Sequence, residues 1–209
     1  MSACFASRVI GAVVLAGALI WGPALARAGA PTEQLKVSVQ QIVKVLEDPA
    51  LRPEVKAKER RAAIRKEAEG AFDFAETARR ALGRHWPGLS DADRQEFTTL
   101  FTDLLERAYI SRIEKYSGEQ IAYAGELVDG GLATVRTRFV TKAGTEIPVD
   151  YRMAQRGDRW LVYDVAVEGV SLINNYRTQF DKIIQASSYG ELVRRLKAAD
   201  VTSPGSPRF

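Results

Sequence analysis

The chain contains one histidine, His85, and every site that needs an imidazole depends on it. It lies in the segment GRHWP (83–87), which is typical of the connection after a helix. A Ser/His/Asp or Cys/His site would pair it with an activated nucleophile, and a zinc site would need three or four nitrogen or sulfur ligands. The one cysteine, Cys4, stands in a segment that we expect to be removed. We therefore expect His85 to be a packing or hydrogen-bonding residue, with no metal site and no catalytic residue.

Carboxylates are the remaining candidates for acid–base chemistry. Asp150 and Asp164 fall on expected strands, and Glu126 and Glu168 fall near strand ends. A cone-shaped α+β domain can direct one such group into a pocket as a general base. The alternative, which we favour, is that these carboxylates pair with arginines on the strands. Those arginines are Arg136, Arg138 and Arg152.

Composition excludes several other classes of protein. The sequence has no G-x-x-x-x-G-K-[ST] loop and no Rossmann glycine pattern, so no nucleotide phosphate site is expected. The 30 Lys and Arg residues exceed the 26 Asp and Glu residues by only four. A nucleic-acid binder normally has a larger and clustered excess, so we expect no nucleic-acid partner. The abundant feature is apolar side chains, at 46% of 209 residues, which is ample for one folded domain.

The N-terminus has the anatomy of a secretory signal. Arg8 precedes an apolar run, Val9 to Trp21, which is too short for a membrane span of about 20 residues. Small residues then suggest cleavage after Ala28 or, as a second choice, after Ala26. A retained signal anchor is the alternative. We expect residues 1–28 to be a cleaved signal peptide, which leaves an exported chain with no cysteine and no transmembrane segment.

Helical periodicity covers the first half of the mature chain. Asp73 and Ser90 are expected N-caps, and Gly83 suits a left-handed C-cap. The expected helices are 31–47, 54–69, 74–82 and 91–116.

The period then changes to that of strands joined by short turns, which predicts an antiparallel meander. Pro148 suggests an edge strand or a bulge, and the fourth strand is apolar on both faces and expected to be central. The expected strands are 120–127, 132–141, 146–155 and 159–167.

Helical spacing returns after the strands. Val170 to Ile184 forms one apolar stripe, and Ser188 is the expected N-cap of a last helix. The segment 201–209 has no pattern and is expected to be disordered. Helices followed by a meander and closing helices predict one α+β domain over residues 29–200.

The stretch from Phe72 to Leu196 resembles the MlaC family, also known as toluene-tolerance proteins. The matching segments are FDFAETARRALGRHWPGLSDADRQEFTTLFTDLLERAY, EIPVDYRM, WLVYDVAVEGVSLINNYRTQF and SYGELVRRL. The resemblance implies an NTF2-like fold, with four or slightly more antiparallel strands packed against several helices around a hydrophobic cavity. It also implies a periplasmic carrier with phospholipid as cargo and no other cofactor.

The same resemblance implies two protein partners, an outer-membrane lipoprotein–porin complex and an inner-membrane ABC transporter with an MCE-domain ring. Shuttling lipid between them would maintain outer-membrane lipid asymmetry. One branch of the family is associated with hopanoids, so a hopanoid carrier is an alternative. An NTF2-like enzyme with a carboxylate base is the other alternative.

On this resemblance, part of the apolar core is expected to be hollow and to hold acyl chains. The candidates for its wall come from the long helix, the sheet and the stripe that follows it. They are Phe97, Phe101, Leu104, Leu105, Val149, Tyr151, Val165, Val167, Val170, Ile173 and Tyr176. The last three would close the mouth.

Overall fold

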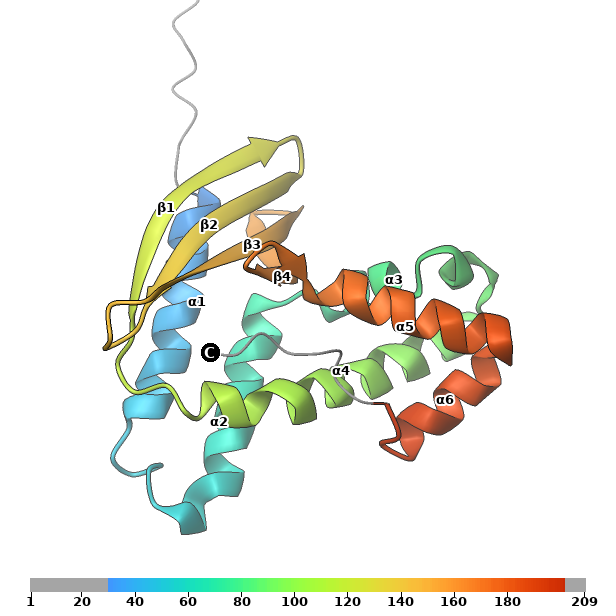
Figure 1. The fold of residues 1–209 in the computed structure, drawn as a ribbon, viewed down its shortest axis with the longest axis horizontal. Helices are drawn as coiled ribbons and strands as arrows, with labels where there is room; N and C mark the ends of the chain where they lie inside the picture. Colours follow the sequence, from blue (N-terminus) through green and yellow to red (C-terminus); the bar gives the residue numbers. More distant parts are fainter. Residues whose placement is uncertain (1–29, 202–209) are drawn as a thin grey trace, which may run out of the picture.

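Two N-terminal helices begin the described part of the protein (Figure 1). The computed structural model describes residues 30–201, so the predicted signal peptide and residues 202–209 of the expected tail lie outside the described residues. Helix α1 spans Ala30–Glu47. Helix α2, Ala57–Ala71, follows the 3-10 turn η1, Glu54–Lys56. The second predicted helix therefore starts as a tighter 3-10 turn, a common way for a helix to begin.

Side-chain caps set the start of the next two helices. In α3 (Phe74–Leu82), the Asp73 carboxylate accepts a hydrogen bond from the Glu76 N–H at 2.9 Å. In α4 (Asp91–Ile113), Ser90 Oγ accepts one from the Asp93 N–H at 3.1 Å. The 3-10 segment η2, Gly83–Gly88, joins the two helices. Both predicted caps are confirmed, and α4 ends three residues before the predicted Tyr116.

The strands form one antiparallel sheet in sequence order. The predicted four-strand meander is confirmed, with a short fifth strand added at the β4 edge, and the α+β prediction is confirmed with it. The strands are β1 (Gln120–Asp129), β2 (Leu132–Val140), β3 (Glu146–Arg156), β4 (Arg159–Val167) and β5 (Val170–Ser171).

Pro148 does not mark an edge strand or a bulge, contrary to expectation. It lies in β3, between β2 and β4, in regular register with Arg138. Its carbonyl accepts a hydrogen bond from the Glu168 N–H, just beyond the end of β4. A proline is tolerated there because the ladder between β3 and β4 starts only at Val149. The irregularity in this pair lies instead between Arg152 and Met153.

Two helices close the fold. Ser171 caps α5 (Leu172–Ala186), and Ser188 caps α6 (Tyr189–Lys197). Val170 belongs to β5 rather than to the helical stripe, which corrects the sequence-based assignment. Val201, the first residue of the expected tail, is 5% exposed and packs among the helices.

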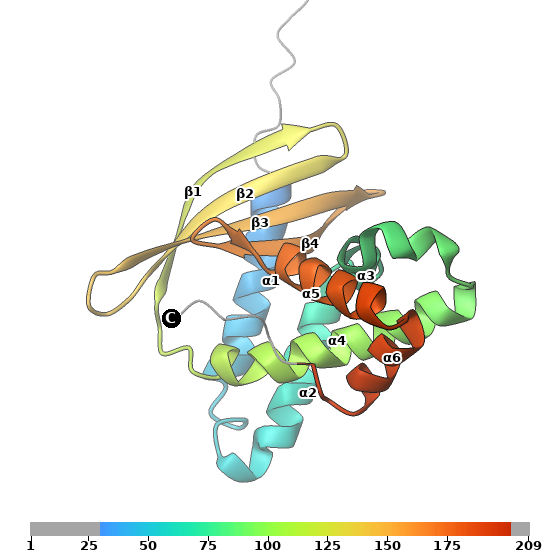
Figure 2. The ribbon, with the colours of Figure 1, turned by 45° about the vertical axis from the view of Figure 1, so that its right-hand side comes forward.

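The two faces of the sheet have different roles. The inner face, defined here as the face that packs against α1, carries Val135, Tyr151 and Val165 in register across three strands. The next position of β3, Arg152, lies on the opposite, outer face because strand side chains alternate. Helices α3, α5 and α6 lie beyond β4, and α4 runs from this group back across α2 towards the start of β1, as Figures 1 and 2 show.

Candidate functional site

The candidates on the helices lie in one packed cluster, named here the helical cluster. Phe97, Phe101, Ile173 and Tyr176 are all buried in it. The Phe101 ring meets the Tyr176 ring edge to face at 5.1 Å between centroids. Such contacts fill space as efficiently as a protein core. These rings therefore form the interior of the helical layer. The remaining candidates of the cluster are Leu104, which is buried, and Leu105, which is only partly buried.

The candidates on the sheet lie on its inner face. Val149 and Val167 are paired across β3 and β4 and buried, and with Ile147 they form a second cluster, named here the sheet-end cluster. Tyr151 and Val165, also paired, are half-buried and border both this cluster and the one beneath α1. Burial raises the pKa of the Tyr151 phenol above its ordinary value. Tyr151 is therefore surrounded by protein and yet keeps accessible surface.

The helical and sheet-end clusters are distinct apolar groups. Within residues 30–201, α4 packs chiefly against α3 and α6, and its contacts with the strands are sparse. Leu105 and Tyr109 on α4, and Phe139 on β2, border the clusters without being fully buried. Val170, expected at the mouth, is 49% exposed on β5. The structure thus divides the predicted wall between two layers whose bordering side chains are incompletely covered.

The candidate carboxylates do not converge on a common site. Glu126 accepts hydrogen bonds from Thr32 at the start of α1. Asp150 stands directly opposite Arg136 in the strand register, and Glu168 is exposed in a turn. Asp164 pairs with Arg152 at 2.9 Å, as the ion-pair interpretation predicted.

His85 contacts a carboxylate on α5 and none of the candidate strand acids. Its Nε2 lies 2.7 Å from Asp181 Oδ1 on α5, and Arg84 binds the same oxygen. Across residues 30–201 no group of three or more His, Cys, Asp or Glu side chains is placed to hold a metal ion. The same residues contain no helix with both the length and the hydropathy of a membrane span. His85 has the hydrogen-bonding role that the sequence predicted.

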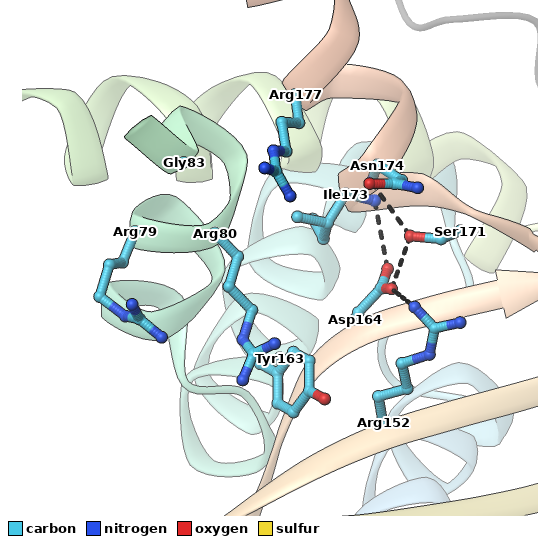
Figure 3. Close-up of a pocket in the computed structure, with 10 residues that line it drawn as sticks. All are labelled: Arg79, Arg80, Gly83, Arg152, Tyr163, Asp164, Ser171, Ile173, Asn174 and Arg177. Carbon is cyan, nitrogen blue, oxygen red and sulfur yellow. Dashed lines mark hydrogen bonds and ion pairs between the residues drawn. The ribbon is translucent and has the colours of Figure 1, made fainter. Parts of the chain in front are cut away.

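Asp164 fastens α5 to the sheet. It is 4% exposed and accepts hydrogen bonds from Ser171 Oγ at 2.6 Å and from the Ile173 N–H at 3.1 Å (Figure 3). With the pair to Arg152, three donors satisfy this buried carboxylate. Ser171 was not expected as a partner, because neither its spacing nor its type distinguishes it from an ordinary N-cap.

Two adjoining polar pockets lie beside the contacts that Asp164 makes with Ser171, Ile173 and Arg152. The first has a volume of about 310 Å³ and includes Arg79, Arg80 and Arg152 in its wall. The second, of about 340 Å³, shares Asn174 and Arg177 with the first. Arg152 was expected only as an ion-pair partner of a strand carboxylate, and Arg79, Arg80 and Arg177 were not expected at a site. The spacing of Glu76, three and four residues before the Arg79–Arg80 pair, was a signal that could have located part of the cluster.

Glu76 is the acid that organises the α3 arginines. Its carboxylate lies 2.6 Å from Arg79 and 2.7 Å from Arg80. The hydrogen bond from Arg79, supported by Arg80, lowers the pKa of Glu76 from its ordinary 4.5 to about 2, against the opposing effect of burial.

Acid titration should therefore reveal Glu76. Because its pKa is lower in the folded state, its stabilisation is complete above pH 4.5 and is lost as the pH falls towards 2. We expect Glu76→Gln to lower the free energy of unfolding at pH 7 by about 1–2 kcal/mol, since water screens the exposed arginines. Urea denaturation between pH 2 and 7 measures the difference. Glu146→Gln, in an exposed pair with Arg138, is the control, and an equal effect of both variants would contradict the assignment.

Comparison with known proteins places these features in context. The family model described as MlaC protein matches residues 36–198. The intermembrane phospholipid transport system binding protein MlaC of Haemophilus influenzae is 23% identical over 123 residues, covering 56% of this chain. The match spans 58% of that relative's length. A solved phospholipid-binding protein from Ralstonia solanacearum, in complex with a phospholipid, is 25% identical. Its TM-score is 0.70, with 80% of this chain and 95% of that chain covered.

Proposed function

The chain belongs to the MlaC family, and on that premise we propose that it is a phospholipid-binding transport protein. The observation that carries the proposal is the pair of apolar layers whose bordering side chains stay incompletely covered, within a fold shared with a phospholipid complex. Leu105 on α4 and Tyr151 and Val165 on the inner face are the bordering residues that acyl chains would contact.

The energetics of lipid transfer explain why such a protein needs an apolar interior. A two-tailed lipid has about 30 methylenes, and at ~0.8 kcal/mol each their exposure to water would cost on the order of 20 kcal/mol. A carrier surrounds the acyl chains with its own apolar side chains in place of the hydrocarbon core of the bilayer. The net gain is small, which keeps loading and unloading reversible.

The rigid aromatic contacts of Phe101 and Tyr176 would support one side of the site. The half-buried positions would move to admit the chains, with the headgroup left outside. The wall then comprises the predicted residues of both layers, and Val170 stands near its rim. The proposed role requires binding and release only, with no catalytic step.

The proposed cellular role follows the family. The protein would carry phospholipid through the periplasm, after removal of its signal peptide, between an outer-membrane lipoprotein–porin complex and an inner-membrane ABC transporter with an MCE-domain ring. This exchange would maintain the lipid asymmetry of the outer membrane. The H. influenzae relative's name as an intermembrane transport component supports this assignment.

Purified mature protein is expected to carry phospholipid at near-stoichiometric level, because a bound lipid keeps its acyl chains out of water. Organic extraction of the folded protein followed by lipid mass spectrometry measures it. Well-folded protein that yields no lipid and does not bind added phospholipid would contradict the proposal. Recovery of a hopanoid alone would instead favour the other branch of the family.

A further inference from the structure

The strongest feature that lipid carriage leaves unexplained is a continuous groove of arginines. The first of the two polar pockets is shown in Figure 3. The second shares Asn174 and Arg177 with it, so together they run from β3 and β4 along α3 and α5. We call their combined surface the arginine groove. Its arginines are Arg79, Arg80, Arg84, Arg152 and Arg177.

Several of these guanidinium groups are held in place without a ligand. Arg80 stacks on the Tyr163 ring at 3.8 Å from its centroid. Arg177 lies against the backbone of Gly83, where a Cβ atom would stand only 2.8 Å from Arg177 Nε. Gly83 also has a φ of +52°, which favours glycine. Preorganised side chains lose less conformational entropy when they bind.

The groove carries more positive than negative charge. Glu76 serves both Arg79 and Arg80, and Asp164 and Asp181 serve Arg152 and Arg84. Among the described residues no hydrogen bond or ion pair engages the exposed Arg177 guanidinium. Five arginines therefore face three carboxylates, which leaves an excess of two positive charges. Guanidinium groups bind carboxylates and phosphates in a bidentate geometry, so the expected ligand is an oxyanion.

The groove adjoins the proposed lipid site at Ile173, which lines the first pocket and belongs to the helical cluster, but its arginines lie outside the proposed wall. Arg152 lies on the outer face of β3, whereas its neighbour Tyr151 lies on the inner face.

The depth and length of the groove favour a protein ligand. Its floor is formed by side chains that are less than 9% exposed, those of Tyr163, Asp164 and Ser171. A flat membrane surface presents its phosphates in a plane, whereas a protein segment can project Asp or Glu side chains into a recess. The succession of arginines from β3 to Arg84 suits several such carboxylates in a row.

We propose that the arginine groove is the docking site for an acidic segment of a protein partner. This inference rests on the proposed function, because a carrier must meet the protein that loads or unloads it. Docking on the outer face would leave the inner face free to exchange lipid.

The test uses the mature protein and a fluorescein-labelled peptide in which glutamates alternate with alanines. Fluorescence anisotropy at low salt should give saturable binding of the acidic peptide. The counterpart with glutamine in place of glutamate should bind more weakly by at least about tenfold. The double variant Arg79→Gln/Arg177→Gln should weaken binding of the acidic peptide by about tenfold, because it removes the groove's excess of two positive charges. Glu76 retains Arg80 in this variant, so α3 keeps its ion pair.

Arg52→Gln/Arg107→Gln is the matched control, since both arginines are exposed and lie outside the groove. It should change peptide affinity by less than about twofold. Equal weakening by the two double variants, or equal binding of the glutamine peptide, would overturn the proposal. Groove-dependent binding of phosphatidylglycerol vesicles without peptide binding would identify a membrane site and also overturn it.

Lipid extraction of the same proteins separates this inference from the proposed function. The groove variant should retain wild-type phospholipid content, since neither Arg79 nor Arg177 belongs to the proposed lipid wall. If the wild-type protein binds the peptide but no lipid, the proposed lipid transport is contradicted, whereas the proposal that the groove binds an acidic ligand still holds.

Discussion

Val165→Asp and Val149→Asp proteins are expected to emerge from purification without phospholipid. Both side chains lie on the inner face, Val149 buried and Val165 half-buried at the border between clusters. A carboxylate there would meet acyl chains instead of water, which costs several kcal/mol unless the lipid is excluded. Lipid mass spectrometry of the folded fraction, checked by circular dichroism, measures the loss.

Two features make this experiment decisive. Val165 is incompletely covered, so Val165→Asp can hydrate its new charge and keep the fold even if Val149→Asp cannot. Thr134→Asp is the control, because it adds the same charge on the outer face, opposite Arg152 in the register. It should retain wild-type lipid content. Normal phospholipid content in folded Val165→Asp protein would place the tails elsewhere.

Local signals in the sequence predicted most element boundaries. Asp73, Ser90 and Ser188 each precede a helix and accept a hydrogen bond from the N–H three residues later, as a cap should. Gly130 has a φ of +55° in the β1–β2 turn, which glycine allows. These features depend on a few residues that are neighbours in the sequence, so the sequence alone is enough to predict them.

Features that depend on tertiary pairing were less predictable. Val170 has the spacing of the α5 stripe, yet it lies in β5 and pairs with Val167 of β4. Pro148 carries the usual signal of an edge, but the end of β4 makes it compatible with an inner strand. In both cases the deciding contact comes from another element, which periodicity alone does not specify.

The candidate site shows the same division. Apolar spacing identified both Phe101 and Leu105, but it cannot distinguish the interior of a packed layer from its incompletely covered border. The structure makes that distinction, because Phe101 is 1% exposed and Leu105 is only partly buried. Likewise, the Arg152–Asp164 pair was predicted from strand charges, while the donors that complete it come from the following turn and helix.

Removal of the Asp164 carboxylate is expected to give the largest loss of stability. Asp164→Ala would leave Ser171 Oγ and the Ile173 N–H without their acceptor and Arg152 without its ion pair. Buried donors without partners and a broken charge pair together should lower the free energy of unfolding by about 2–4 kcal/mol. Asp164→Asn keeps one acceptor oxygen and the volume, so it should lose only about 1–3 kcal/mol.

Urea denaturation of lipid-free proteins measures these losses, since bound lipid would itself stabilise the fold. Asp150→Asn, also on the outer face but only half-buried, is the control and should change stability by less than about 1 kcal/mol. His85→Ala likewise acts on stability alone, through its contact with Asp181. Because these groups fasten helices to each other and to the sheet, every folded variant should still bind and release phospholipid. A chemically altered lipid that forms with the wild-type protein and disappears in Asp164→Asn would instead show that Asp164 acts on the lipid as a general base.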